Sequence, residues 1–84
     1  MGYQAGTEEG EGRIDLTAIG RNIDRLRVAK GLSMERLGGE IGYTSTAVCR
    51  WANGQAVPHL DALYRIAKYF GVTIDSLFDG VEDE

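Results

Sequence analysis

The side chains best suited to chemistry in this 84-residue chain are gathered in one stretch, GYTSTAVCRWANG at positions 42–54. The stretch carries three consecutive hydroxyl groups, a thiol, a guanidinium and a carboxamide. These groups donate and accept hydrogen bonds, and the guanidinium adds a permanent positive charge. Such a set is suited to binding a polar or anionic partner, because charge-assisted hydrogen bonds are among the stronger ones that proteins make.

The same residues do not indicate catalysis. Cys49 and His59, the single cysteine and the single histidine, lie ten positions apart and fall on different predicted elements. A nucleophile and its base have to lie within hydrogen-bonding reach of each other. The sequence also has no glycine-rich phosphate loop and no cysteine pair. We therefore expect no enzyme activity, no cofactor, no metal site and no internal disulfide.

Positions 42–54 are predicted to form a turn followed by a short helix. Thr44 is the expected N-cap, because hydroxyl residues favour the start of a helix over its interior. Val48 and Trp51 lie three residues apart, so they share one face and are expected to point inward. The Asn-Gly pair at 53–54 ends the helix. The other polar side chains of the stretch are left on the outward face.

Hydrophobic periodicity predicts four more helices and no strand of useful length. Caps and glycines set the expected ends. The predicted helices begin at Asp15 or Thr17 and run to about Lys30, then span Ser33–Ile41, Thr44–Asn53, His59–Phe70 and Ile74–Phe78. Besides Val48 and Trp51, the expected inward residues are Ile19, Ile23, Leu26, Leu37, Ile41, Leu60, Leu63, Ile66, Ala67, Phe70, Ile74, Leu77 and Phe78. The expected fold is all-α, with five short helices around one core.

Charge is distributed unevenly along the chain. We predict a disordered, acidic, glycine-rich arm at residues 1–13, one domain at 14–78 and an acidic tail at 79–84. The formal net charge is −4, yet the nine Lys and Arg residues all lie between positions 13 and 78, where there are six acids. A local excess of positive charge permits docking onto a polyanion, although a solvated surface is usually mixed anyway. A single cysteine allows no internal disulfide, so we expect the reducing cytoplasm as the location. No signal peptide or membrane-spanning run is visible, and we expect no membrane partner.

The short helices on either side of Gly42 have the layout of a helix-turn-helix. The wider sequence resembles the DNA-binding domain of phage repressors and Cro proteins, the xenobiotic-response-element family of bacterial regulators. The resemblance covers Ile19 to Phe78 and rests on LRxxKGLSxxxL, a small residue at Gly38, VxRWxxG, and PxxxxLxxIAKxFGVxxxxLF. It implies a compact five-helix lambda-repressor-like domain whose third helix enters the major groove of DNA.

The resemblance also implies which residues touch DNA. Base contacts are carried over to Ser45, Thr46, Cys49 and Arg50, and phosphate contacts to Thr44 and Asn53. Each residue also has a plainer interpretation that stays open. Thr44 could be only a helix cap, Ser45 and Thr46 only first-turn residues, and Arg50 a phosphate contact. Cys49 could be a small packed thiol or a redox group, and Asn53 a residue suited to a left-handed turn.

Three positions depart from the family pattern. Met34 replaces a glutamine that contacts phosphate, so one anchor is missing. Ala52 replaces a glutamate that pairs with the arginine at position 27, so Arg27 needs another acceptor. Gly38 meets a need for a small residue between two helices, whereas Gly39 should cost up to roughly 1 kcal/mol relative to alanine.

The function expected from these features is sequence-specific DNA binding by a transcriptional regulator, acting as a repressor and reading the major groove with the helix at 44–53. Its expected partner is double-stranded DNA with a pseudo-palindromic operator, bound by a homodimer. The expected dimer surface combines Gln55 to His59 with the fifth helix, unless that helix merely closes the core. The alternative is a protein-interaction module, such as an antitoxin or a helix-turn-helix fold that has lost DNA binding.

Overall fold

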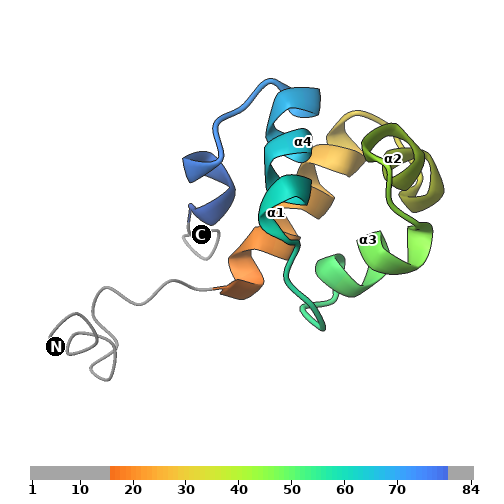
Figure 1. Ribbon diagram of the computed structural model, residues 1–84, viewed down its shortest axis with the longest axis horizontal. Coiled ribbons are helices and arrows are strands. Elements are labelled where there is room, and N and C mark those ends of the chain that lie inside the picture. The colour runs from red at the N-terminus through yellow and green to blue at the C-terminus, as the bar shows by residue number, and fades with distance from the viewer. Residues whose placement is uncertain (1–15, 80–84) are drawn as a thin grey trace, which may run out of the picture.

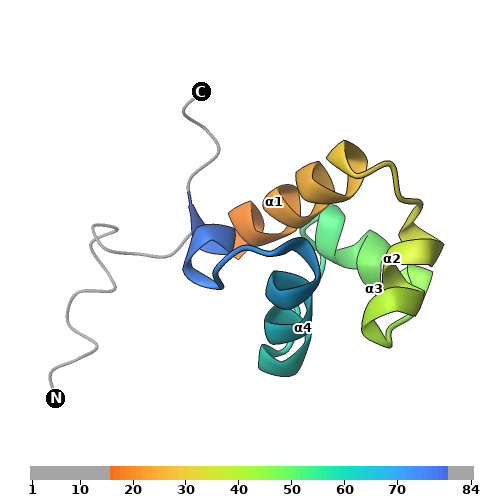
Figure 2. The ribbon, with the colours of Figure 1, turned by 90° about the horizontal axis from the view of Figure 1, so that it is seen from above.

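Four α-helices and one short 3₁₀ helix make up the computed structural model, which describes residues 16–79. The helices are α1 (Leu16–Ala29), α2 (Met34–Ile41), α3 (Ser45–Ala52) and α4 (Leu60–Phe70), followed by the 3₁₀ helix η2 (Asp75–Phe78). Both views place α2 and α3 at one end of the domain and η2 at the other (Figures 1 and 2). The predicted arm at 1–13, the tail beyond Asp79 and a cap at Asp15 lie outside the described residues.

The expectation of five α-helices was wrong at the last segment, which forms η2. Its backbone N–H groups donate to carbonyls three residues earlier, from Leu77 to Ile74 at 2.9 Å and from Asp79 to Ser76 at 3.2 Å. Thr73 caps this turn, because its side chain accepts from the N–H of Ser76 at 3.1 Å. A segment this short cannot complete the longer α-helical ladder, so the tighter 3₁₀ pattern is the natural outcome.

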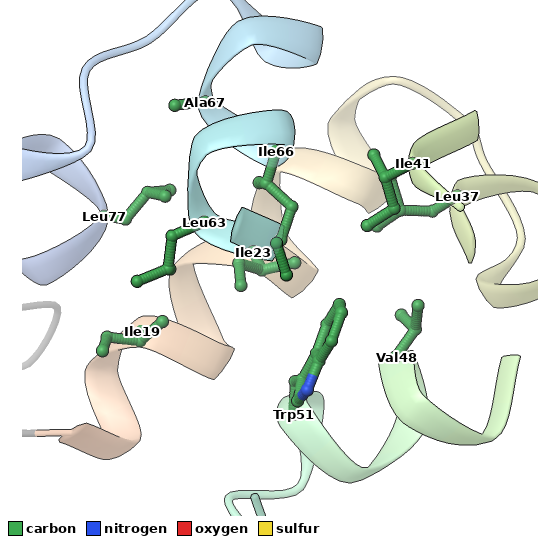
Figure 3. Close-up of a cluster of buried hydrophobic side chains, with 11 residues drawn as sticks. Ile19, Ile23, Leu37, Ile41, Val48, Trp51, Leu63, Ile66, Ala67 and Leu77 are labelled. Carbon is green, nitrogen blue, oxygen red and sulfur yellow. The ribbon is translucent and has the colours of Figure 1, made fainter. Parts of the chain in front are cut away.

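One hydrophobic core joins all the helices. Figure 3 shows Val48 and Trp51 rising from α3 toward Ile41 and Ile66. The expected inward residues are buried at ten positions and partly buried at Leu26, Phe70, Ile74 and Phe78. The buried ten are Ile19, Ile23, Leu37, Ile41, Val48, Trp51, Leu63, Ile66, Ala67 and Leu77.

Leu60 was wrongly expected in the core, because 74% of it is exposed. The buried stripe of α4 is formed by Ala62, Leu63, Ile66 and Ala67. At 100° per residue, Leu60 lies beyond the edge of this stripe and shares a face with the residue four positions later. Its hydrophobic side chain therefore faces solvent at the start of the helix.

A buried polar residue that the sequence did not single out holds η2 against α1. Asn22 is 5% exposed, and its side-chain N–H₂ group donates to the carbonyls of Leu77 at 2.8 Å and Asp79 at 2.9 Å. Its side-chain oxygen accepts from Arg25 at 3.0 Å. Since buried amides are costly when unpaired, this network fixes the position of η2 and Asp79 against α1.

Within residues 16–79, three glycines lie inside helices, and two of them allow close backbone contact. A Cβ at Gly38 would lie 2.7 Å from the carbonyl oxygen of Tyr43, as expected for the junction of α2 and α3. A Cβ at Gly20 would overlap the carbonyl oxygen of Trp51 and lie 2.8 Å from its carbonyl carbon. Gly20 therefore lets α1 approach the last turn of α3, a contact that the sequence did not predict.

The third helical glycine, Gly39, has open space around the position of a Cβ. It lies on the exposed side of α2 and has no left-handed backbone. Gly39→Ala should therefore stabilise the fold by roughly 0.5–1 kcal/mol, because alanine loses less conformational freedom in a helix. Equilibrium denaturation of both proteins measures the change. A loss of stability would contradict the prediction, because it would show that a methyl group at this position is not accommodated.

Candidate functional site

The turn before α3 is built by local hydrogen bonds that the sequence encodes. Gly42 ends α2 with a φ of 83°, a left-handed conformation that suits glycine. The N–H of Tyr43 donates to the carbonyl of Gly38 at 2.7 Å. Thr44 then caps α3, as expected, by accepting from the N–H of Ala47 at 3.1 Å. The result is a sharp turn that packs α3 against α2, and Figure 1 shows α3 along the lower edge of the domain.

The outward arc of α3 carries the predicted site residues. Ser45, Thr46 and Arg50 are exposed along the helix, Cys49 is partly buried, and Thr44 and Asn53 are exposed at its two ends. At 100° per residue, Ser45, Thr46, Cys49, Arg50 and Asn53 form one arc opposite the buried Val48 and Trp51. The structure therefore gathers five of the six predicted residues on one face, and the sixth, Thr44, caps the N-terminal end of the helix.

Arg50 stands out among the positive charges of the domain. Within residues 16–79 it is the only Lys or Arg side chain for which the structure shows no hydrogen bond, ion pair or aromatic contact. Arg36, for comparison, pairs with Glu40 at 2.8 Å, and this hydrogen bond raises the pKa of Arg36. The guanidinium of Arg50 is thus left with all its donors available to an external partner.

The polar side chains at the two ends of α3 form hydrogen bonds within the helix. The side-chain amide of Asn53 donates to the Sγ of Cys49 at 3.4 Å, one turn earlier. The alternative of a left-handed Asn53 is wrong, since its φ is −91° and the left-handed residue is Gly54. Thr44 uses its oxygen as an acceptor in the cap, which leaves its hydroxyl hydrogen free to donate.

The departures from the family pattern have clear structural outcomes. Arg27 finds the acceptors that Ala52 cannot supply: it pairs with Asp24 at 2.9 Å and donates to the carbonyl of Leu32 at 2.6 Å. Met34, the first residue of α2, is partly buried and packs against the core. It therefore contributes packing at the position where the family pattern has a glutamine.

Tyr43 packs beside the candidate site, and the sequence did not single it out. Its hydroxyl donates to the carboxylate of Asp61, with distances of 3.0 and 3.1 Å to the two oxygens. Its ring meets the ring of Trp51 edge-to-face, with centroids 5.3 Å apart. Partial burial and then the hydrogen bond to Asp61 raise the pKa of Tyr43 above its ordinary value. No local pattern marks this tyrosine, because Asp61 lies 18 positions away.

The side of α3 that faces the loop before α4 is hollowed. The hollow has a volume of about 260 Å³ and is lined by Tyr43, Ala47, Arg50, Trp51, Ala56, Val57 and His59. His59 precedes α4 and is exposed, and its side chain makes no capping hydrogen bond. Arg50 and His59 thus border the same concave surface.

Residues 16–79 contain no group of three or more His, Cys, Asp or Glu side chains placed to hold a metal ion. Over the same part of the chain, no helix has both the length and the apolar character needed to cross a membrane.

The sequence matches the helix-turn-helix family over residues 23–77. A related sequence is the HTH-type transcriptional activator BcrR of Enterococcus faecalis, 37% identical over 60 residues, which cover 71% of this chain and 29% of that protein. The chain thus spans about three tenths of the length of this curated relative.

Solved structures show the same fold. The restriction-modification controller protein C.AhdI from Aeromonas hydrophila is 31% identical, with a TM-score of 0.69, over 76% of this chain and 97% of its own. The P22 c2 repressor, solved in complex with a synthetic operator, is 22% identical, with a TM-score of 0.70, over 74% of this chain and 94% of its own. The second likeness concerns the fold alone.

Proposed function

Since this chain belongs to the helix-turn-helix family of phage-repressor and Cro-like proteins, we propose that it is a DNA-binding transcriptional regulator that reads the major groove with α3. The observation that carries the proposal is the outward arc of α3, with small polar side chains and an unpaired Arg50. Small residues let a helix approach base edges, and arginine binds guanine through two hydrogen bonds. Helix α3 is thus the proposed recognition helix.

The contacts follow from the places of the side chains. Ser45, Thr46, Cys49 and Arg50 lie along the middle of the arc and are proposed to face the bases. The hydroxyl of Thr44 and the side chain of Asn53 lie at the two ends and are proposed to donate to phosphates, which position the helix. Cys49 presents a small, weakly polar group that suits contact with a thymine methyl.

Selection of binding sites from random duplex DNA tests the function. The purified chain should enrich one sequence, and the logarithm of its affinity should fall linearly with the logarithm of the salt concentration, because bound phosphates release counterions. An enriched pool without sequence preference would contradict specific recognition. No binding at low salt would instead favour the protein-interaction module, an alternative supported by the packing of Met34 in place of a phosphate contact.

The exposed hydrophobic residues point to a homodimer as the DNA-bound form. Val57, Leu60 and Tyr64 are 42%, 74% and 56% exposed and are close in the chain at the start of α4. Leu77 is fully buried, so η2 closes the core and adds little to such a surface. We propose Val57, Leu60 and Tyr64 as the α4 patch through which two copies meet on a pseudo-palindromic operator.

Leu60→Ala should raise the dissociation constant of the dimer at least tenfold on operator DNA, because both copies lose a leucine side chain whose burial contributes roughly 1.5–3 kcal/mol. Leu16→Ala, at a half-exposed leucine outside the α4 patch, is the control and should change little. Stoichiometry on the selected operator, measured across protein concentrations, gives the answer. One chain per asymmetric site in the unsubstituted protein would rule out the dimer.

A further inference from the structure

Tyr43 connects three parts of the domain. It follows the glycine that ends α2 and precedes the cap of α3. Its hydroxyl binds the carboxylate of Asp61 in the first turn of α4, and its ring contacts Trp51 in the last turn of α3. A single side chain thus contacts both α4 and the far end of the recognition helix.

The recognition helix has few direct contacts with α4, so the contacts of Tyr43 matter for the orientation of α3 relative to α4. The contacts of α3 with other helices are made mainly with α2 and α1. Its orientation relative to α4 is therefore not set by a broad helix-to-helix interface. The hydrogen bond from Tyr43 to Asp61 ties the start of α3 to the start of α4 directly.

A second contact braces the same turn from α4. The guanidinium of Arg65 donates to the carbonyl of Ile41 at 3.3 Å, at the end of α2. Asp61 and Arg65 lie four residues apart on α4, so they share one face of that helix. The turn between α2 and α3 is therefore held against α4 at two points, one on each side of Gly42.

Asp61 lies next to the proposed dimer surface, so its hydrogen bond to Tyr43 bears on how a dimer would bind DNA. Leu60 belongs to the α4 patch and directly precedes Asp61, and Tyr64 of the same patch follows within one turn. If two copies meet through this patch, the separation of their recognition helices depends on how α3 is held relative to α4. That separation has to match the spacing of two half-sites, about one turn of DNA.

We propose that Tyr43 is a positioning residue that sets the half-site spacing which the dimer accepts, acting through its hydrogen bond to Asp61. This inference rests on the proposed function as a dimeric DNA-binding protein. The role differs from base recognition, because the hydroxyl of Tyr43 is engaged with a carboxylate of its own chain. It also differs from core packing, because the hydrogen bond lies at the surface.

The test measures spacing preference in place of affinity alone. Duplexes carry two copies of the selected half-site with the centre-to-centre distance varied one base pair at a time. The unsubstituted protein should bind one spacing best. Tyr43→Phe keeps the ring but removes the hydroxyl, and should reduce the preference for that spacing by about three- to tenfold, since one charge-assisted hydrogen bond is lost. Binding to a single half-site should change little.

Three further variants separate this role from a general loss of fit. Tyr69→Phe removes a hydroxyl for which the structure shows no hydrogen bond within residues 16–79, and should keep the original spacing preference. Asp61→Ala should reproduce the effect of Tyr43→Phe, and combining the two should add nothing further. Asp61→Asn keeps an acceptor oxygen and should retain most of the preference.

The outcomes are distinguishable. An unchanged spacing preference in Tyr43→Phe, or additive losses in the combined variant, would overturn the positioning role. If Tyr43→Phe fails to fold, the comparison of Asp61→Ala with Asp61→Asn decides the same question. If the unsubstituted protein enriches no DNA site, the proposed function is wrong. That result is distinct from failure of the positioning role, which requires a protein that binds DNA specifically.

Discussion

Gly20→Ala should destabilise the domain by about 2–4 kcal/mol, a large share of the stability of so small a fold. The added methyl would overlap the carbonyl oxygen of Trp51, and it would lie 2.8 Å from the carbonyl carbon. Both atoms belong to the backbone of α3, so no side-chain rotation relieves the contact. Alanine gains about 1 kcal/mol over glycine in helix propensity, which offsets part of the cost but not most of it.

Gly39→Ala is the matched control for this experiment. The same substitution is made inside a helix, but nothing lies within 4 Å of the new methyl. Chemical denaturation should therefore give changes of opposite sign for the two variants. Equal changes would mean that α1 and α3 can separate at little cost. In that case the close approach at Gly20 would not fix the end of the recognition helix.

Short-range signals in the sequence predicted the helices well. Ser33 and Thr44 cap α2 and α3 as expected, because each needs only an N–H group three residues away. The expected inward faces are also largely confirmed, since helical periodicity alone decides which side chains of α1, α2 and α3 point the same way. Near the start of α4 the rule failed at Leu60, which lies at the edge of the buried stripe.

Contacts between distant segments could not be predicted in the same way. Asn22 binds carbonyls 55 and 57 residues further on, and Tyr43 binds a carboxylate 18 residues further on. Gly20 matters only because Trp51 passes beside it. Each side chain is compatible with several local environments, and tertiary packing selects one. The choice of a 3₁₀ helix over an α-helix at Asp75–Phe78 depends on the same packing.

The outward-facing residues of the candidate site were predicted from the sequence, but the internal partners of its charged residues were not. Helical geometry indicated which residues of α3 face outward, and the structure gathers these on one arc. The sequence did not show which of the nine Lys and Arg residues would lack an internal partner. That depends on neighbours such as Glu40 for Arg36 and Asp24 for Arg27, which only the folded chain brings together. Contact of each residue with DNA stays a prediction.

Arg50→Ala should weaken specific DNA binding by about 1–3 kcal/mol for each half-site and relax base preference at one operator position. The reason is that Arg50 is exposed on the outward arc of α3 and its donors are unoccupied. In a two-fold complex both copies lose the contact, so the total loss would be about 2–6 kcal/mol. Titration of the selected operator and of its single-base variants measures both effects.

Two companion variants identify the kind of contact that Arg50 makes. Arg50→Lys keeps the positive charge but loses the planar fork that binds guanine in a bidentate manner. If Arg50 reads a base, the lysine variant should also show relaxed preference at that position. If it binds a phosphate, the lysine variant should bind almost normally, and Arg50→Ala should weaken binding to all sequences alike and lower the salt dependence by about one phosphate contact.

Lys30→Ala is the control: it removes a positive charge whose ammonium lies over the ring of Tyr69, and it should leave base preference unchanged. A selected site identical in Arg50→Ala and the unsubstituted protein would exclude base recognition by Arg50.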